Sequence, residues 1–334
     1  MGHGPGHAAF SSLTFDFSPV ASTEITIRNI TFRNPVLTAS GTFGYGLEAD
    51  AFVDVAELGG VVTKSISRRP RDGNPPQRIA ETTAGMLNSI GLANVGMDAF
   101  LGTKLPLLVQ RRATVVVNIA ASSIEEYCHV LERCEEHEGI AGYEINVSCP
   151  NVKDGGLNFG THCPSVAEIT RELRKRTGKF LAIKLTPNVT SIGEFAKACE
   201  GEGADAVSCI NTVVGMAVDA RTRRPKIATI TGGYSGPAIK PIALAKVYEV
   251  RKAVSIPIIG IGGIMNAEDA IEFMIVGASL IQVGTALFID PAAGVKIARG
   301  IEAYLREHGM ASVTELIGSL DTSMQPSLVA AGWT

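Results

Sequence analysis

Five of the apolar runs that predict buried strands end in an amide or amine side chain. These residues are Lys64, Asn118, Asn146, Lys184 and Asn211. A single lysine at a strand end could extend to solvent or pair with an acid, but five such side chains at equivalent positions indicate one polar site. Their donors and acceptors suit a flat, polar, anionic heterocycle. The sequence therefore predicts a small-molecule site built from several strand ends.

Cys149 follows one of these runs and lies in the segment NVSCPNVKDGG, among proline, asparagine and glycine. Cysteine is most often a small buried residue. Four others fall within predicted helices or strands and fit that interpretation: Cys128, Cys134, Cys199 and Cys209. Cys163 is undecided. A thiolate can act as a general base where nearby charge tunes its pKa, so Cys149 is the candidate catalytic group.

Two later runs end in glycine, as GIGGI at 260–264 and VGTAL at 283–287. Backbone N–H groups in such turns can hold a phosphate monoester. The candidates are Gly262, Gly263, Gly284 and Thr285. The pattern indicates a phosphate without naming the molecule that carries it.

Short β-branched runs alternate along the chain with helical patterns. The predicted strands span residues 35–40, 60–65, 114–120, 143–148, 180–186, 205–211, 256–263 and 279–286. The helical patterns span 48–58, 123–138, 165–178, 191–203, 241–254, 266–277 and 292–308. The strands are apolar nearly throughout, as expected where both faces of a parallel sheet are covered. Eight such alternations predict an α/β protein with a (β/α)8 TIM barrel.

Two strand-to-helix connections are unusually long, at about 66–113 and 212–240, and a β-hairpin is predicted before the barrel. The hairpin covers residues 23–35, with its turn near Arg28–Asn29. Barrel active sites lie on the loops that follow the strands, and loops this long are uncommon unless they have a function. We therefore expect the two insertions to cover the site.

The composition excludes several classes of protein. Lys+Arg number 30 and Asp+Glu 33, and this balance is not that of a general nucleic-acid binder. No apolar run reaches the roughly 18 residues of a membrane-spanning helix, and no secretory signal is visible. The six cysteines form no CxxC pair, so we predict no metal site. We expect a cytoplasmic protein with reduced thiols and no membrane partner.

The two ends of the chain differ from its middle. Residues 1–22 are rich in Gly, His, Ser and Pro, and the last residues lack a long periodic apolar pattern. We predict a flexible extension at 1–22, a single barrel domain at 23–310 and a C-terminal extension of unknown role at 311–334.

Taken together, nine segments resemble the class 1 dihydroorotate dehydrogenases. They are TASGTFGYG, VVTKSIS, MLNSIGLANVG, NVSCPNVKDGG, AIKLTPN, INTVVGM, GGYSGPAIKPIAL, IGIGGI and QVGTALF. The resemblance covers about residues 24–305. NxSCPNxxxGG together with GGxSGPAIKPxAL is most similar to class 1B. Class 1A lacks the SGPAIKP run, and class 2 has serine where this chain has Cys149.

The resemblance implies an FMN-binding barrel that oxidises (S)-dihydroorotate to orotate in pyrimidine (UMP) biosynthesis. It implies that Cys149 removes the C5 proton while C6 gives a hydride to the flavin. The implied substrate residues are Lys64, Asn88, Ile90, Gly91, Leu92, Asn146, Asn151, Asn211 and Thr212. The implied FMN residues are Ala39, Ser40, Gly41, Lys64, Ser65, Asn118, Asn146, Lys184, Ser235, Gly236, Gly262, Gly263, Gly284 and Thr285.

Class 1B resemblance also implies a partner subunit. That subunit would carry FAD and a 2Fe–2S cluster and pass electrons to NAD. Two catalytic chains and two partners would form a heterotetramer around a homodimer core. The C-terminal DTSMQPSLVAAGWT has no counterpart in the family pattern, so it gives no indication of where a partner docks.

Other functions stay open at this point. The FMN barrel of dihydropyrimidine dehydrogenase shares the NxSCP loop, but those systems carry cysteine-rich ferredoxin-like segments and this chain has no CxxCxxC run. A Schiff-base aldolase could use Lys184 as its nucleophile in a phosphate-binding barrel. A non-catalytic binding barrel is the third alternative. A flavin spectrum would distinguish an FMN enzyme from the aldolase and from the binding barrel.

Overall fold

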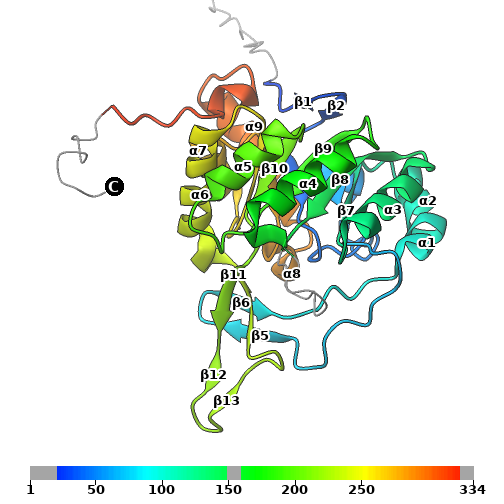
Figure 1. The fold of residues 1–334 in the computed structure, drawn as a ribbon. Coiled ribbons are helices and arrows are strands. Elements are labelled where there is room, and N and C mark those ends of the chain that lie inside the picture. The colour runs from blue at the N-terminus through cyan, green and yellow to red at the C-terminus, as the bar shows by residue number, and fades with distance from the viewer. Residues whose placement is uncertain (1–20, 149–158, 324–334) are drawn as a thin grey trace, which may run out of the picture.

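Eight apolar segments form the parallel strands of a closed barrel, in the order in which they occur along the chain (Figure 1). The computed structural model describes residues 21–148 and 159–323. The barrel strands are β3 (Val36–Thr38), β4 (Gly60–Val62), β7 (Val115–Ile119), β8 (Ile140–Asn146), β9 (Phe180–Lys184), β10 (Ala206–Cys209), β15 (Ile258–Ile261) and β16 (Leu280–Val283). β16 pairs with β3 and closes the ring. The predicted (β/α)8 barrel is confirmed.

Helices cover the outside of the barrel because their apolar faces pack on the strands. Six of the predicted helices are present: α3 (Ile124–Glu135), α4 (Cys163–Arg174), α5 (Ile192–Gly201), α6 (Lys240–Ala253), α7 (Ala267–Val276) and α9 (Ala293–Glu307). Two begin at side-chain caps. The Ser123 hydroxyl accepts from the backbone N–H of Glu126, and the Asn266 side chain accepts from that of Asp269. Such caps satisfy N–H groups that have no partner within the helix.

The helix predicted over residues 48–58 is wrong. Only the 3₁₀ turn η1 (Val55–Glu57) forms there. Asp54 accepts from the backbone N–H of Ala56, and Glu48 folds back to accept from the N–H of Tyr45. These local side-chain bonds compete with a helix, as short polar side chains often do.

Helices also occur where the sequence predicts none. They are α1 (Met97–Ala99), the π-helical segment η2 (Phe100–Lys104), α2 (Leu105–Gln110) and α8 (Ala286–Ile289). The first three lie within the long connection after β4 and pack on the barrel through buried Phe100 and Leu108. Three further 3₁₀ turns are η3 (Phe159–Thr161), η4 (Pro237–Ile239) and η5 (Val313–Leu316).

The predicted hairpin is confirmed and lies at the amino-terminal end of the barrel strands. β1 (Ile25–Ile27) pairs antiparallel with β2 (Ile30–Phe32). At the turn, Arg28 donates to the carbonyl of Gly178 at 2.8 Å and to the carboxylate of Asp205 at 2.7 Å. These two residues precede β9 and β10, so the hairpin is fixed to the end opposite the strand carboxyl termini.

The two long connections pair with each other and form a second, four-stranded sheet, in the order β11 (Val213–Met216), β14 (Thr231–Ser235), β6 (Gly85–Asn88), β5 (Ile79–Thr82). A two-stranded extension, β12 (Val218–Asp219) with β13 (Arg224–Pro225), projects beyond it. In Figure 1 this sheet lies at the end of the barrel opposite the hairpin. It therefore lies at the carboxyl ends of the barrel strands, where barrel active sites occur.

The segment after α9 packs back onto the barrel. Ser22 pairs with Ser312, and Val313 and Leu316 are buried. Further along, the N–H of Leu320 donates to the carbonyl of Ile275 on α7. The division of the chain at residues 22 and 310 stays a prediction. Within residues 21–148 and 159–323, no helix is long and apolar enough to cross a membrane.

Candidate active site

Two of the predicted strand-end amides meet at the mouth of the barrel. Asn146 ends β8, and Asn211 follows β10. The side-chain amide of Asn211 donates to that of Asn146 at 3.2 Å. The Asn211 side chain also accepts from the backbone N–H of Thr212 at 2.8 Å. This bonding orients both amides, and Thr212, around one point at the strand ends.

The insertion sheet brings Asn88 to the same place. Asn88 on β6 pairs with Gly233 on β14, and its amide donates to the Gly233 carbonyl at 3.3 Å. A Cβ at Gly233 would lie 2.2 Å from the Thr212 hydroxyl, so glycine is required for this close approach. Asn88, Thr212, Asn211 and Asn146 therefore form one connected group, although they come from three separate segments: β6, β8 and the connection after β10.

The turn formed by Ile90, Gly91 and Leu92 follows β6. Its carbonyls are held by asparagines: Ile90 accepts from the N–H of Asn74 at 3.0 Å, and Leu92 from the side chain of Asn94 at 2.8 Å. Gly91 has φ +72, and Leu92 has φ +57. Leucine rarely adopts this left-handed conformation, which is a feature often found at ligand-binding segments.

Lys64 follows β4 and is partly buried. Burial lowers the pKa of Lys64 below that of an ordinary lysine; the Glu48 carboxylate opposes this shift, and the Arg78 guanidinium adds to it. A partly desolvated ammonium at a strand end can bind an anion more strongly than a hydrated one.

A second polar group lies inside the barrel, beneath the first. Lys184 ends β9, and Asn118 lies on β7; their exposed fractions are 6% and 0%. Asn118 accepts from the Ser65 hydroxyl at 2.6 Å and donates to Glu144 at 2.7 Å. The Lys184 ammonium lies 3.6 Å from the same Glu144 oxygen. Three predicted cofactor residues thus share one network, centred on an acid that the sequence analysis missed.

The ends of β14, β15 and β16 meet through glycine and hydroxyl groups. A Cβ at Gly263 would lie 2.8 Å from the backbone N of Lys240 and 3.0 Å from the carbonyl oxygen of Gly236, so only glycine allows this approach. The Thr285 and Ser235 hydroxyls lie 3.1 Å apart. Gly263 and Thr285 are therefore both brought next to the end of β14, while a Cβ at Gly262, the residue before Gly263, would lie 2.8 Å from that of Ala243 on α6.

The last predicted residues lie where β3 meets β16. The N–H of Ala39 donates to the carbonyl of Val283 at 2.7 Å. A Cβ at Gly284 would lie 3.4 Å from that of Ala39. Gly41, one residue beyond Ser40, has φ +93 and no atom within 4 Å of where a Cβ would lie. This open space beside close backbone segments fits a phosphate-bearing cofactor.

Cys149 and Asn151 lie outside the described residues. The other cysteines lack the environment of a reactive thiol. Burial raises the pKa of Cys134 and Cys199 to about 12, and it also raises that of Cys209. Cys163, undecided from sequence, begins α4, and its thiol lies 3.6 Å from the backbone carbonyl of Glu194 on α5. A raised pKa disfavours the thiolate that base catalysis needs.

A family model described as dihydroorotate dehydrogenase matches residues 22–305. The chain belongs to the dihydroorotate dehydrogenase family. The resemblance found in the sequence motifs is therefore confirmed. Two similar relatives carry the name dihydroorotate dehydrogenase B (NAD(+)), catalytic subunit. The relative from Geotalea daltonii is 53% identical over 296 residues, which cover 89% of this chain and 97% of the relative. The relative from Bacteroides thetaiotaomicron is 49% identical over 302 residues, covering 90% and 100%.

A solved structure of a dihydroorotate dehydrogenase from Eimeria tenella, in complex with ferulenol, is similar in fold. Its TM-score is 0.76 over 93% of this chain and 91% of that chain, at 21% sequence identity. At this identity the likeness shows the fold alone. It agrees with the closed eight-stranded barrel of this chain.

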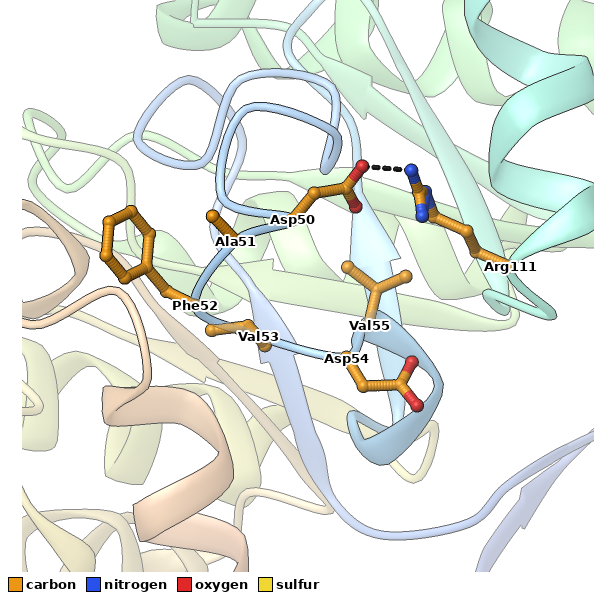
Figure 2. A pocket seen from close by; sticks show the side chains of 7 residues that line it. All are labelled: Asp50, Ala51, Phe52, Val53, Asp54, Val55 and Arg111. Carbon is orange, nitrogen blue, oxygen red and sulfur yellow. Dashed lines mark ion pairs between the residues drawn. The ribbon is translucent and has the colours of Figure 1, made fainter.

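The hollow in Figure 2 lies away from the candidate site at the strand ends. It is lined by Asp50, Ala51, Phe52, Val53, Asp54, Val55 and Arg111. Asp50 and Arg111 form an ion pair across it, and Asp54 caps η1. These residues precede β4 and β7, so the hollow is near the amino ends of those strands, and its charged groups already have partners within the protein. No group of three His, Cys, Asp or Glu side chains that could hold a metal occurs among the described residues.

Proposed function

We propose that this chain oxidises (S)-dihydroorotate to orotate in de novo pyrimidine biosynthesis, as an FMN-binding catalytic subunit linked to NAD. The observation that carries the proposal is the connected group Asn88, Asn146, Asn211 and Thr212 at the barrel mouth. The group offers amide donors and acceptors at fixed positions to a flat ring with imide and carboxylate groups. The named relatives support the same reaction.

The substrate is held by the polar residues at the mouth of the barrel. The amides of Asn88, Asn146 and Asn211 bond the ring edges, and the Lys64 ammonium binds the carboxylate. Removal of the C5 proton requires a base on one face of the ring, and Cys149 is the proposed base. Asn151, in the same motif, is proposed to contact the substrate beside it. The turn from Ile90 to Leu92 contributes backbone groups to the same pocket.

FMN is held by two sets of residues: the network around Lys184 and Asn118 inside the barrel, and the glycine and hydroxyl groups at the ends of β14, β15 and β16. When bound, FMN supplies the acceptor for the C6 hydride. Backbone N–H groups at Gly236, Gly263 and Thr285 bind its phosphate, and Gly41 leaves space for its approach. Asn118 and Ser65 bond the ring edge. Lys184 offsets the negative charge that the ring gains on reduction.

Bound FMN gives the first test. We expect the purified chain to be yellow, with a flavin spectrum, and the cofactor released by heat to be FMN and not FAD, because the glycine and hydroxyl groups at the ends of β14, β15 and β16 are proposed to bind a single phosphate monoester. Absorbance and chromatography of the released cofactor measure this. A colourless protein that still oxidises dihydroorotate would refute the FMN assignment, and trapping by borohydride with substrate would instead support the aldolase reading.

Orotate binding is expected to depend on pH through Lys64. Since burial lowers the pKa of Lys64, its ammonium loses its proton at a lower pH than ordinary lysine. The bound carboxylate of orotate favours the protonated Lys64. The affinity for orotate is therefore highest at pH values below the pKa of Lys64 in the free enzyme, and it falls as the pH rises through that pKa. Flavin absorbance titrations from about pH 7 to 10.5 measure the dissociation constant.

The matched variant for this titration is Lys64→Met. The variant should bind orotate weakly at every pH. As the pH rises, its affinity should change only through the ionisation of orotate itself. Comparing it with the unsubstituted chain separates the ionisation of Lys64 from that of orotate. Parallel pH profiles for the two proteins would contradict the role of Lys64.

The proposed partner subunit carries FAD and a 2Fe–2S cluster, and two copies of each chain form a heterotetramer around a homodimer in the cytoplasm. An exposed apolar surface on the insertion sheet supports the proposal that a partner protein binds there. Val214, Met216 and Val218 are 63%, 54% and 51% exposed in succession along β11 and β12. Exposed apolar side chains grouped on consecutive strands are typical of protein-binding surfaces.

A further inference from the structure

Glu144 is a buried acid that the proposed reaction leaves without a role. It lies on β8 inside the barrel, and its side chain is 1% exposed. Side chains from four other strands surround it. One carboxylate oxygen accepts from Asn118 at 2.7 Å and lies 3.6 Å from the Lys184 ammonium. The other accepts from the Ser208 hydroxyl at 2.7 Å and from the Gln282 amide.

A purely structural role is the plain alternative. Barrel interiors are normally filled by apolar layers, and a buried carboxylate must be compensated by donors and a cation. Two observations go beyond that. Two of the partners, Asn118 and Lys184, are residues that the proposed function assigns to FMN. In addition, the side-chain oxygen of Gln282, whose amide nitrogen donates to Glu144, is the one buried side-chain polar atom of the described residues without a hydrogen-bond partner, as expected beside a polar ligand.

Glu144 fixes both of these FMN residues. The Asn118 amide bonds Ser65 with its oxygen and Glu144 with its nitrogen, so its orientation is determined. Lys184 is held by charge at 3.6 Å. In a site with little water, both charges act strongly on a neighbouring ring. The negative charge of Glu144 opposes the stabilisation that Lys184 gives to a reduced, negatively charged flavin.

We propose that Glu144 is a positioning residue that orients Asn118 and Lys184 toward the flavin and keeps the midpoint potential of the flavin low. The proposal rests on the proposed function, since it requires bound FMN. A lower potential makes the reduced flavin a better donor to the next electron carrier. Glu144 does not contact the reacting atoms and acts through Lys184.

The test is Glu144→Gln in the full, FMN-loaded chain, with the flavin midpoint potential measured by spectroelectrochemical titration. We expect FMN to remain bound and the reduced-to-oxidised ratio at a fixed potential to rise at least tenfold, about 30 mV for a two-electron couple. The rise should be smaller when Lys184→Met is already present, since the effect acts through that residue.

The matched control is Glu135→Gln. Glu135 on α3 also pairs with a lysine, Lys179, at 3.7 Å, but it is partly exposed and lies outside the barrel. This control removes the same charge and should leave the potential unchanged. A Glu144→Gln protein with lowered thermal stability and an unchanged potential would overturn the proposal and leave Glu144 a structural residue.

A second variant keeps the proposal testable if Glu144→Gln does not fold. Glu144→Asp retains the charge but moves the carboxylate away from Lys184, so the potential should rise by a smaller amount. An unchanged potential in folded, FMN-bound Glu144→Asp would also overturn it.

Failure of the proposed function would look different. If the unsubstituted chain contains no flavin, both proposals fail. If the chain contains flavin and neither Glu144 variant changes the flavin potential, only the proposal about Glu144 fails.

Discussion

Cys149→Ser is expected to slow reduction of the bound flavin by dihydroorotate about 10²–10⁴-fold at pH 7, the usual contribution of general base catalysis. A serine hydroxyl has a pKa far above the roughly 8.5 of a free thiol, so it is a poor base near neutral pH. FMN and orotate binding should be retained, since the substitution replaces one sulfur by oxygen and leaves every residue assigned to FMN and orotate unchanged. Anaerobic stopped-flow measurement of flavin absorbance gives the rate.

Cys163→Ser is the matched control for that experiment. Cys163 begins α4 and donates to the backbone of α5, and burial raises its pKa, so its thiol ionises less readily than a free one. Its replacement should change the rate of flavin reduction little. Unchanged flavin reduction in Cys149→Ser, or a large loss in Cys163→Ser, would reverse the assignment of the base.

The barrel could be predicted from the sequence because its signal is local. Each strand is a short apolar run, such as Val115–Ile119, and each is followed by a segment with a helical pattern. Parallel strands buried on both faces need no long-range information to be recognised. The helix predicted over 48–58 failed for an equally local reason. Asp54 and Glu48 bond neighbouring backbone N–H groups, and the apolar spacing alone cannot reveal that competition.

The insertion sheet could not be predicted in the same way. Its strands GMLN and TGGYS are short and rich in glycine, without the alternation that marks a strand. Their stability comes from pairing Asn88 with Gly233, residues that are far apart in the chain. Asn88 and Thr212 were found only from motif resemblance, whereas Lys64, Asn146 and Asn211 also stood out as polar strand ends. The structure supplies the physical link between Asn88 and Thr212, because Gly233, which pairs with Asn88, lies against the Thr212 side chain.

Glu144 shows the limit of reading a site from strand ends. It is a single acid inside the run YEINVS, and nothing around it in the sequence marks it as central. Its partners Asn118, Ser208 and Gln282 come from three other strands, and only closing the barrel brings them together. A lone charged residue within an otherwise apolar strand is the one signal that could have identified it, because such a charge requires compensation.

The isolated chain is expected to reduce artificial dyes or oxygen with electrons from dihydroorotate, yet to show no turnover with NAD. Its sequence has no GxGxxG that follows a strand, opens a helix and precedes a ribose-binding acid. It also has no cysteine spacing for an iron–sulfur cluster. Electrons from the reduced flavin must therefore leave through another molecule. Steady-state assays with dye, oxygen, fumarate and NAD as acceptors measure this directly.

Adding the proposed FAD and iron–sulfur subunit should then confer NAD reduction on the same preparation. A triple replacement, Val214→Ser, Met216→Ser and Val218→Ser, tests whether the partner docks on the insertion sheet, because these side chains are exposed and distant from the barrel interior. It should leave dye reduction intact and weaken NAD reduction in the reconstituted enzyme. Efficient NAD reduction by the chain alone would refute the need for a partner, and rapid turnover with fumarate would place the protein closer to class 1A. Full NAD activity of the reconstituted triple variant would place the docking surface elsewhere, since electron transfer requires the two proteins to stay in contact.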